Sequence, residues 1–127
     1  MESVKLNHTI VWCHDGQRSA SFLVQVLGLS NPVPFGPFLV VALSNEVSLD
    51  FHQAEGEITS QHYAFLITED EFDLIFGRIC EQGITYWADP DLQEFDEINL
   101  ADGGRGVYFK DPDGHLLEVI TRPYGSG

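Results

Sequence analysis

Residues 108–118 of this 127-residue chain read Tyr-Phe-Lys-Asp-Pro-Asp-Gly-His-Leu-Leu-Glu. The central Asp-Pro-Asp-Gly is typical of a tight turn, because proline presets one backbone angle and glycine accepts a positive φ. The residues on both sides of the turn have the apolar and aromatic character of strands. The segment therefore predicts a hairpin with strands at 106–110 and 115–121, and it places Glu118 within the second strand.

A strand, a helix and another short strand are predicted ahead of this hairpin. Residues 61–68 alternate between two faces, which is typical of a strand. Thr68 and Glu71 form a capping-box pattern, and the apolar stripe that follows extends to Gly83, so a helix is predicted there. With a further extended run at 84–87, the second half of the chain has the order βαβββ.

The first half of the chain follows the same order. A strand is predicted at 5–13. A helix is predicted from the capping residue Asp15 to Gly28, where glycine favours a left-handed stop. Three extended runs follow, separated by turn residues; they lie at 29–34, 38–43 and 47–53.

Matching positions indicate that the two halves are copies of one motif. His8 corresponds to His62, and Asp50 corresponds to Glu118, each within similar local sequence. Strand alternation places these four side chains on the faces opposite the predicted helices, among apolar neighbours. An unpaired carboxylate in such surroundings is unfavourable unless a cation or hydrogen bonds compensate its charge. A bound metal ion would do so.

The repeat predicts an α+β fold of two tandem βαβββ modules, which form a curved mixed sheet around a metal-centred cavity. Module one covers about 5–53 and module two about 61–121, within a single domain over 1–127. The extra length of module two falls in the acidic loop 89–104. This loop is expected either to be solvated or to fold over the cavity as a lid.

The proposed ligand set favours catalysis over a purely structural metal. A lone histidine on a strand would by default be an ordinary hydrogen-bonded residue, but here a second histidine holds the equivalent place. Two imidazoles and one carboxylate leave coordination positions open for water or substrate. Structural zinc usually takes four closed ligands, often cysteines. Cys13 and Cys80 offer no such set and are predicted to be buried thiols.

Over residues 5–121, the paired βαβββ units, the strand-borne histidines and the segment 108–118 resemble the vicinal-oxygen-chelate superfamily. Its members include glyoxalase I, extradiol dioxygenases, fosfomycin-resistance enzymes and bleomycin-binding proteins. The resemblance implies that His8, His62 and Glu118 bind a divalent metal ion, which is iron, zinc, nickel or manganese. It also implies a small-molecule substrate that carries oxygen atoms.

The resemblance leaves two reactions open. Asp50 matches a further carboxylate of glyoxalase I but is one methylene shorter than the glutamate there, so we expect it to bind the ion or to act as a general base. Tyr108 matches the tyrosine of the extradiol dioxygenase signature, where a phenol donates a hydrogen bond. The histidine that this signature places upstream is missing from Asn99–Ala101. A glyoxalase-like lyase or isomerase and an extradiol-type dioxygenase are therefore both predicted.

Three further residues are candidates for substrate binding. Trp12 shares a face with His8 by alternation, and His52 shares one with Asp50. Arg105 is one of few cations in the chain and could receive an anionic group. The alternative function is a metal-free binding protein of the bleomycin-resistance type, which sequesters an aromatic or cationic drug.

The composition of the chain limits the kinds of partner that it is expected to bind. The formal net charge of −14, from 6 basic and 20 acidic residues, would repel nucleic-acid phosphates and anionic lipid surfaces. No apolar run approaches the roughly 20 residues that cross a bilayer. The first residues also lack the layout of a signal peptide, so a cytoplasmic protein is expected. The resemblance further implies a homodimer, because the family commonly pairs two chains.

Overall fold

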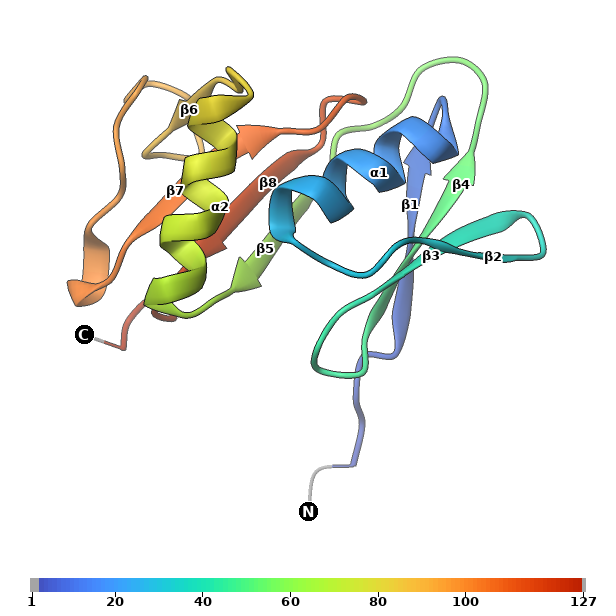
Figure 1. Ribbon diagram of the computed structural model, residues 1–127, viewed down its shortest axis with the longest axis horizontal. Helices are drawn as coiled ribbons and strands as arrows, with labels where there is room; N and C mark the ends of the chain where they lie inside the picture. Colours follow the sequence, from blue (N-terminus) through green and yellow to red (C-terminus); the bar gives the residue numbers. More distant parts are fainter. Residues whose placement is uncertain (1–2, 127) are drawn as a thin grey trace. The chain divides into compact units, whose positions relative to one another are not determined.

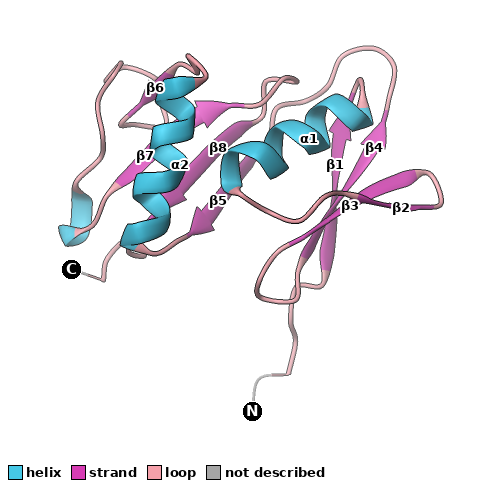
Figure 2. Ribbon diagram, in the orientation of Figure 1, coloured by secondary structure: helices cyan, strands magenta, loops and turns pink. Residues whose placement is uncertain are grey.

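The computed structural model describes residues 3–126, and the chain divides into two compact units between Ile58 and Thr59. Within the described residues, each unit holds one α-helix and one four-stranded mixed sheet (Figures 1 and 2). The predicted α+β fold of two βαβββ modules is therefore confirmed. That the two modules belong to one domain stays a prediction.

The first unit carries its elements in the order β1 (His8–Cys13), α1 (Gly16–Leu27), β2 (Val33–Phe35), β3 (Phe38–Ala42) and β4 (Ser48–Gln53). The strand order in its sheet is β1-β4-β3-β2. β1 runs parallel to β4, and the other neighbours are antiparallel. α1 contacts β3 and β4, so one face of the sheet is covered by the helix.

Helix α1 begins and ends at the residues that its sequence predicts. The Asp15 Oδ1 accepts a hydrogen bond from the Arg18 backbone N–H, with an oxygen–nitrogen distance of 3.2 Å. This bond satisfies one of the N–H groups that the first turn leaves without a partner. At the other end, Gly28 has a φ of 72° and donates its N–H to the Val24 carbonyl. Glycine takes this left-handed conformation without a steric penalty.

Strand β2 is shorter than the extended run predicted at 29–34. It has 3 residues and forms the edge of its sheet. Pro32 and Pro34 lack a backbone N–H and cannot donate to a neighbouring strand. Regular pairing is therefore confined to a short edge segment.

The second unit carries its elements in the order β5 (His62–Leu66), α2 (Glu69–Glu81), β6 (Tyr86–Trp87), the 3-10 turn η1 (Ala101–Gly103), β7 (Gly106–Lys110) and β8 (Leu116–Ile120). The strand order is β5-β8-β7-β6. β5 runs parallel to β8, and the other neighbours are antiparallel. This sheet repeats the first one strand for strand, as the sequence correspondences predict.

Helix α2 has the capping box expected from its sequence. The Thr68 N–H donates to the Glu71 Oε1 at 2.8 Å, and the Glu71 N–H donates to the Thr68 Oγ1 at 3.1 Å. The stripe of Phe72, Ile75 and Ile79 is at most 2% exposed. Within residues 3–126, no helix has the length and apolar character needed to cross a membrane.

The register places the two acids at equivalent points of their sheets. Asp50 lies opposite Ile10 of β1, and Glu118 lies opposite Ala64 of β5. Each acid is therefore two positions along its strand from the residue that pairs with the unit's histidine. The internal repeat thus extends from topology to the positions of the candidate site residues.

Burial follows the predicted alternation in the first unit. Val11 and Phe51, on the helix-covered face, are 2% and 3% exposed. Ile10 and Trp12, on the other face, are 36% and 44% exposed. The face that carries His8 is therefore open to solvent.

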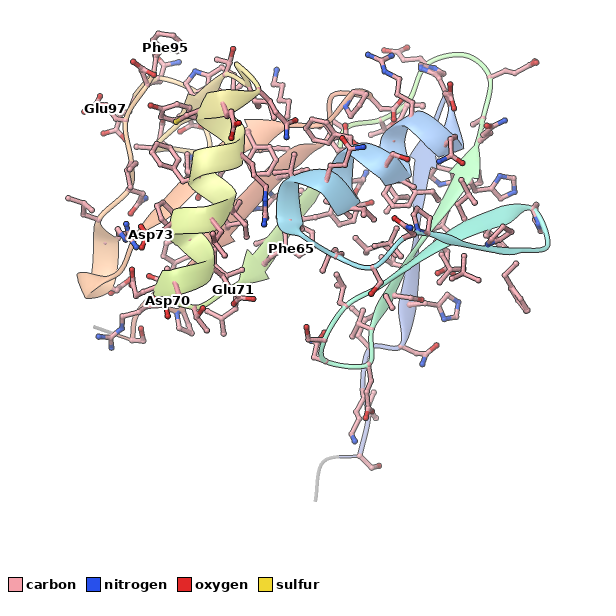
Figure 3. The ribbon with its side chains drawn as sticks, viewed as in Figure 1. Phe65, Asp70, Glu71, Asp73, Phe95 and Glu97 are labelled. Atoms are coloured by element: carbon pink, nitrogen blue, oxygen red, sulfur yellow. The ribbon has the colours of Figure 1, made fainter. Side chains whose placement is uncertain are left out.

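The loop between β6 and β7 is held by its own hydrogen bonds. The Asp89 carboxylate accepts from the backbone N–H groups of Gln93 and Glu94, with Oδ1–nitrogen distances of 2.9 and 2.7 Å. Phe95 is 63% exposed and lies with Glu97 at the outer edge of this loop (Figure 3). The loop has the solvated character that was one of its two predicted forms.

Truncation of the α2 stripe tests this account of the core. Phe72→Ala should lower the free energy of unfolding by about 3–5 kcal/mol, because it leaves a cavity where a buried ring was. Leu74→Ala, in the same helix at a position 61% exposed, should change it by less than about 0.5 kcal/mol. Urea unfolding followed by circular dichroism measures both. Equal effects of the two substitutions would contradict the assigned burial.

Candidate metal centre

The centre of the second unit is a buried carboxylate. Glu118 lies in the middle of β8 and is 1% exposed. Its Oε1 is 3.1 Å from the His62 Nε2. Its Oε2 accepts a hydrogen bond from the Tyr124 hydroxyl. Both oxygens of the carboxylate therefore have partners inside this unit.

His62 faces oxygen atoms at both ring nitrogens. Its Nδ1 is 3.1 Å from the Leu116 carbonyl oxygen, which can only accept. A neutral imidazole has one N–H, so one ring nitrogen of His62 must direct its lone pair at an oxygen atom; with the proton at Nδ1, the facing atoms are Nε2 and the Glu118 Oε1. Two lone pairs at 3.1 Å repel each other. A proton or a cation between the two atoms removes this repulsion.

A divalent ion fits this pair. Such ions bind histidine nitrogen at about 2.0–2.1 Å and carboxylate oxygen at about 2.0–2.2 Å. At ligand angles of roughly 90–110°, these two atoms lie about 2.8–3.5 Å apart, which includes the observed 3.1 Å between His62 Nε2 and Glu118 Oε1. The bond from Nδ1 to a backbone carbonyl is the usual second contact of a metal-binding histidine. The His62 side chain is 46% exposed, so other ligands can reach it.

Tyr108 lies beside this pair. Its ring stacks on the His62 ring with 5.9 Å between centroids, and its hydroxyl is 2.9 Å from the Tyr124 hydroxyl. Burial raises the pKa of Tyr108 above its ordinary value, and hydrogen bonding with Tyr124 raises it further. Tyr108 therefore stays a neutral phenol at physiological pH and can act as a hydrogen-bond donor.

Tyr124 is a site residue that the sequence analysis missed. It follows the last strand in a short segment with Pro123 and Gly125, where strand alternation no longer assigns a face. The available signal was an aromatic residue close behind the strand that carries Glu118. An aromatic residue at that position does not predict in which direction the chain turns after Ile120.

The equivalent pair of the first unit is His8 and Asp50. The His8 Nδ1 is 2.8 Å from the Asn7 Oδ1, so His8 donates there and keeps Nε2 for a ligand. The Ser48 hydroxyl donates to the Asp50 Oδ1 at 2.8 Å. Both units thus present a histidine with Nδ1 engaged and a carboxylate on the same sheet.

A cavity of about 510 Å³ opens on this sheet. Its lining combines an apolar wall with a polar end and consists of Asn7, His8, Ile10, Val33, Pro34, Phe35, Phe38, Val40, Ser48 and Asp50. None of these described lining residues is a lysine or an arginine. The cavity therefore suits an apolar ligand with a few polar atoms better than a strongly anionic one.

Trp12 and His52 lie together on the same sheet. They pair in register across β1 and β4, and their ring centroids are 5.0 Å apart. The Phe38 ring meets His52 edge-on at 5.1 Å. Their predicted role in substrate binding stays a prediction, and the structure groups them as an aromatic cluster.

Arg105 has intramolecular partners on α2. Its Nε donates to the Glu69 Oε1 at 2.8 Å, and its Nη1 donates to the Asp73 Oδ1 at 2.9 Å. The guanidinium also lies 4.4 Å from the centre of the Phe72 ring. These contacts fix the start of β7 to the helix and occupy the group that was predicted to receive a substrate anion.

The proposed ligands come from both units. Within residues 3–126, no group of three or more His, Cys, Asp or Glu side chains is arranged to hold a metal ion. The second unit supplies the pair His62 and Glu118, and His8 belongs to the first unit. Ligation by all three residues stays a prediction.

Comparison with known proteins assigns the family. The model of the Glyoxalase/Bleomycin resistance protein/Dioxygenase superfamily matches residues 5–119. The chain belongs to this superfamily. The resemblance to the vicinal-oxygen-chelate proteins that the sequence predicts is thereby confirmed.

Several solved structures of the superfamily share this fold. Oxidase ChaP-H2 is 59% identical, with 99% of each chain covered and a TM-score of 0.97. A glyoxalase/dioxygenase from Nostoc punctiforme is 25% identical, with 97% of this chain and 99% of that chain covered and a TM-score of 0.70. The mutant fosfomycin resistance protein FosX from Listeria monocytogenes, complexed with Mn(II), is 17% identical, with 96% of this chain and 95% of that chain covered and a TM-score of 0.73. The last likeness shows the fold alone.

Curated proteins of the superfamily are also similar to this chain in sequence. Glutathione transferase FosA of Serratia marcescens is 29% identical over 120 residues, which are 90% of this chain and 78% of that protein. Metallothiol transferase FosB of Shouchella clausii (strain KSM-K16) is 33% identical over 81 residues, which are 64% of this chain and 50% of that protein. Both of these relatives are named as transferases, whereas ChaP-H2 is named as an oxidase.

The ring proton of His62 provides a test of the local geometry. In metal-free protein, the ¹⁵N chemical shifts should show a proton on the Nδ1 of His62, because this atom donates to the Leu116 carbonyl. His14 is the internal control: its Nε2 is 2.6 Å from the Gly56 carbonyl oxygen, so its proton should be on Nε2. An unprotonated Nδ1 in His62 would contradict the assigned hydrogen bond.

Proposed function

We propose that this chain is a divalent-metal-dependent enzyme that uses dioxygen to oxidise a small substrate whose oxygen atoms bind the ion. The observation that carries the proposal is the His62–Glu118 pair, whose Nε2 and Oε1 lie 3.1 Å apart, a separation that suits two ligands of one ion. The 59% identity to Oxidase ChaP-H2 favours oxidation over the lyase or isomerase reaction.

His62, Glu118 and, by family resemblance, His8 would hold the ion. Bound there, a divalent ion would act as a Lewis acid toward substrate oxygens and, if it is iron, would also exchange electrons. The chain's own part is to fix the ligand atoms in advance. Leu116 fixes the His62 ring through Nδ1, and the β5–β8 pairing fixes the spacing of the two strands.

Asp50 and Tyr108 are the proposed proton-handling residues. Asp50 lies at the polar end of the first unit's cavity, and its Oδ1 is held by Ser48. This leaves the Oδ2 to accept a proton from an acidic substrate hydroxyl. Tyr108 is a neutral phenol whose hydroxyl contacts that of Tyr124, and it would donate its proton toward the Glu118 carboxylate through Tyr124.

The lining of the cavity indicates the kind of substrate. Phe35, Phe38 and Pro34 provide an apolar wall, and His8 and Asp50 provide polar atoms. An uncharged, largely apolar compound with hydroxyl or carbonyl oxygens fits this lining. A phosphonate fits poorly, because the described lining residues include no lysine or arginine and the net charge is −14.

We also propose a homodimer, as the family resemblance implies. Exposed apolar side chains on the first unit's sheet support it, with Val33 61%, Phe35 73% and Trp12 44% exposed. Such exposed apolar side chains are typical of surfaces that bind another molecule. Light scattering should give twice the chain mass, and the mass of a single chain would contradict the proposal.

Metal content tests the proposed enzyme directly. Protein purified without chelator should contain about one ion per chain, since one ligand set is proposed for each chain. His62→Ala and Glu118→Ala should lose it, because each substitution removes a ligand. Mass spectrometry of the metals measures the content, and oxygen uptake is followed with a panel of aromatic diols.

The control is His14→Ala, which removes an imidazole whose contact is with the Gly56 carbonyl. It should keep the wild-type metal content. Iron together with oxygen uptake would support oxidation, whereas zinc, nickel or manganese without oxygen uptake would point to lyase or isomerase chemistry instead. If neither wild-type nor variant protein binds metal even after reconstitution, the metal-free drug-binding alternative replaces the proposal.

A further inference from the structure

We propose that Tyr124 is a positioning residue, which holds Glu118 so that only its Oε1 binds the metal ion. The inference rests on the proposed metal site. It assigns a role to Tyr124, which follows the last strand and was not selected by the sequence analysis. Its basis is the way in which the described residues after β8 fold back onto the carboxylate.

The segment that carries Tyr124 is held in place by contacts on both sides. The Gly125 N–H donates to the Asp102 Oδ2 at 3.0 Å. The Arg122 Nη2 donates to the Ser126 carbonyl at 2.9 Å. The second bond closes a short loop of residues 122–126, hereafter the C-terminal strap, and the first attaches it to η1. The strap brings the Tyr124 hydroxyl to the Glu118 Oε2.

Proton counting gives the direction of each hydrogen bond. Each phenol has one O–H, and an ionised carboxylate can only accept, so Tyr124 gives its proton to Glu118. The contact of 2.9 Å between the two hydroxyls must then be a donation from Tyr108 to Tyr124. The result is a chain of donors that runs from Tyr108 through Tyr124 to the carboxylate.

Tyr108 and Tyr124 differ in burial, and this difference indicates a different role for each. Tyr108 is 4% exposed, whereas Tyr124 is 52% exposed. Tyr108 is thus fixed by packing and supports the hydroxyl of Tyr124. Tyr124 contacts the acid directly, and its ring remains open to solvent. Tyr108 also lies opposite Glu118 in the β7–β8 register and stacks on His62, so its effect on the acid passes in part through Tyr124.

This chain of hydrogen bonds determines how Glu118 can bind an ion. The Oε1 faces the His62 Nε2, while the Oε2 is occupied by Tyr124. Bidentate binding would require this charge-assisted hydrogen bond to break, and such bonds are among the stronger ones in proteins. Monodentate binding keeps it and leaves one more coordination position for substrate. Loss of an outer partner of this kind typically weakens metal binding by about 10–100-fold.

The test uses Co²⁺ as the probe ion with full-length protein, and it measures Kd by chelator competition and coordination by visible absorption. Tyr124→Phe should weaken Co²⁺ binding by about 10-fold or more and change the absorption bands, because the freed Oε2 can also bind. Tyr108→Phe should weaken binding less. In the Tyr124→Phe background, Tyr108→Phe should cost less than it does in the wild type, because part of its effect passes through Tyr124.

Two further variants separate positioning from general damage. Tyr63→Phe removes a phenol hydroxyl from the neighbouring position in β5, which faces away from His62 by strand alternation, and it should leave Kd within about twofold of wild type. Asp102→Ala removes the anchor of the strap but keeps the phenol, and it should give a loss between those of Tyr63→Phe and Tyr124→Phe. Thermal unfolding of the metal-free proteins checks that all variants are folded.

The outcomes distinguish this inference from the proposed function. If Glu118→Ala abolishes Co²⁺ binding while Tyr124→Phe binds as wild type does with the same spectrum, the role of Tyr124 is overturned and the metal site stands. If wild type does not bind Co²⁺, or if Glu118→Ala binds it equally well, both are overturned. Additive losses from Tyr108→Phe and Tyr124→Phe would overturn the donor chain.

Discussion

Parallel pairing between the first and last strands of each βαβββ unit is the constraint on which the candidate site depends. In the second unit it aligns Ala64 with Glu118 and leaves His62 two residues earlier on the neighbouring strand. Because side chains alternate along a strand, histidine and acid must then emerge on the same face. The helix covers the opposite face, so the pair is formed by backbone hydrogen bonds and needs no flexible loop to assemble it.

Much of this arrangement could be predicted from the sequence because it follows local rules. Asp15 and the Thr68–Glu71 box cap helices where they were expected. The two-residue period of a strand is enough to predict that His62 and Glu118 each lie on the face away from the helix. The internal repeat predicted the strand order of both sheets, because two segments with the same sequence pattern form the same arrangement of strands.

What could not be predicted lies where periodicity ends. Tyr124 follows a proline in a segment without regular structure, so no period assigns it a direction. The partners of Arg105 depend on the position of α2 beside β7, which sequence spacing does not encode. Its pairing with Glu69 and Asp73 is a tertiary contact, so the charge that looked available for substrate is used within the protein.

The strap after β8 has a practical consequence for work with this protein. Few of its atoms pack in the core, yet one of its hydroxyls touches a buried acid. A fusion partner joined close behind Ser126, or a shortened version that stops before Tyr124, would leave both sheets intact and still disturb the carboxylate. Affinity handles are therefore better attached at the opposite terminus, and loss of activity in a trimmed protein need not signal misfolding.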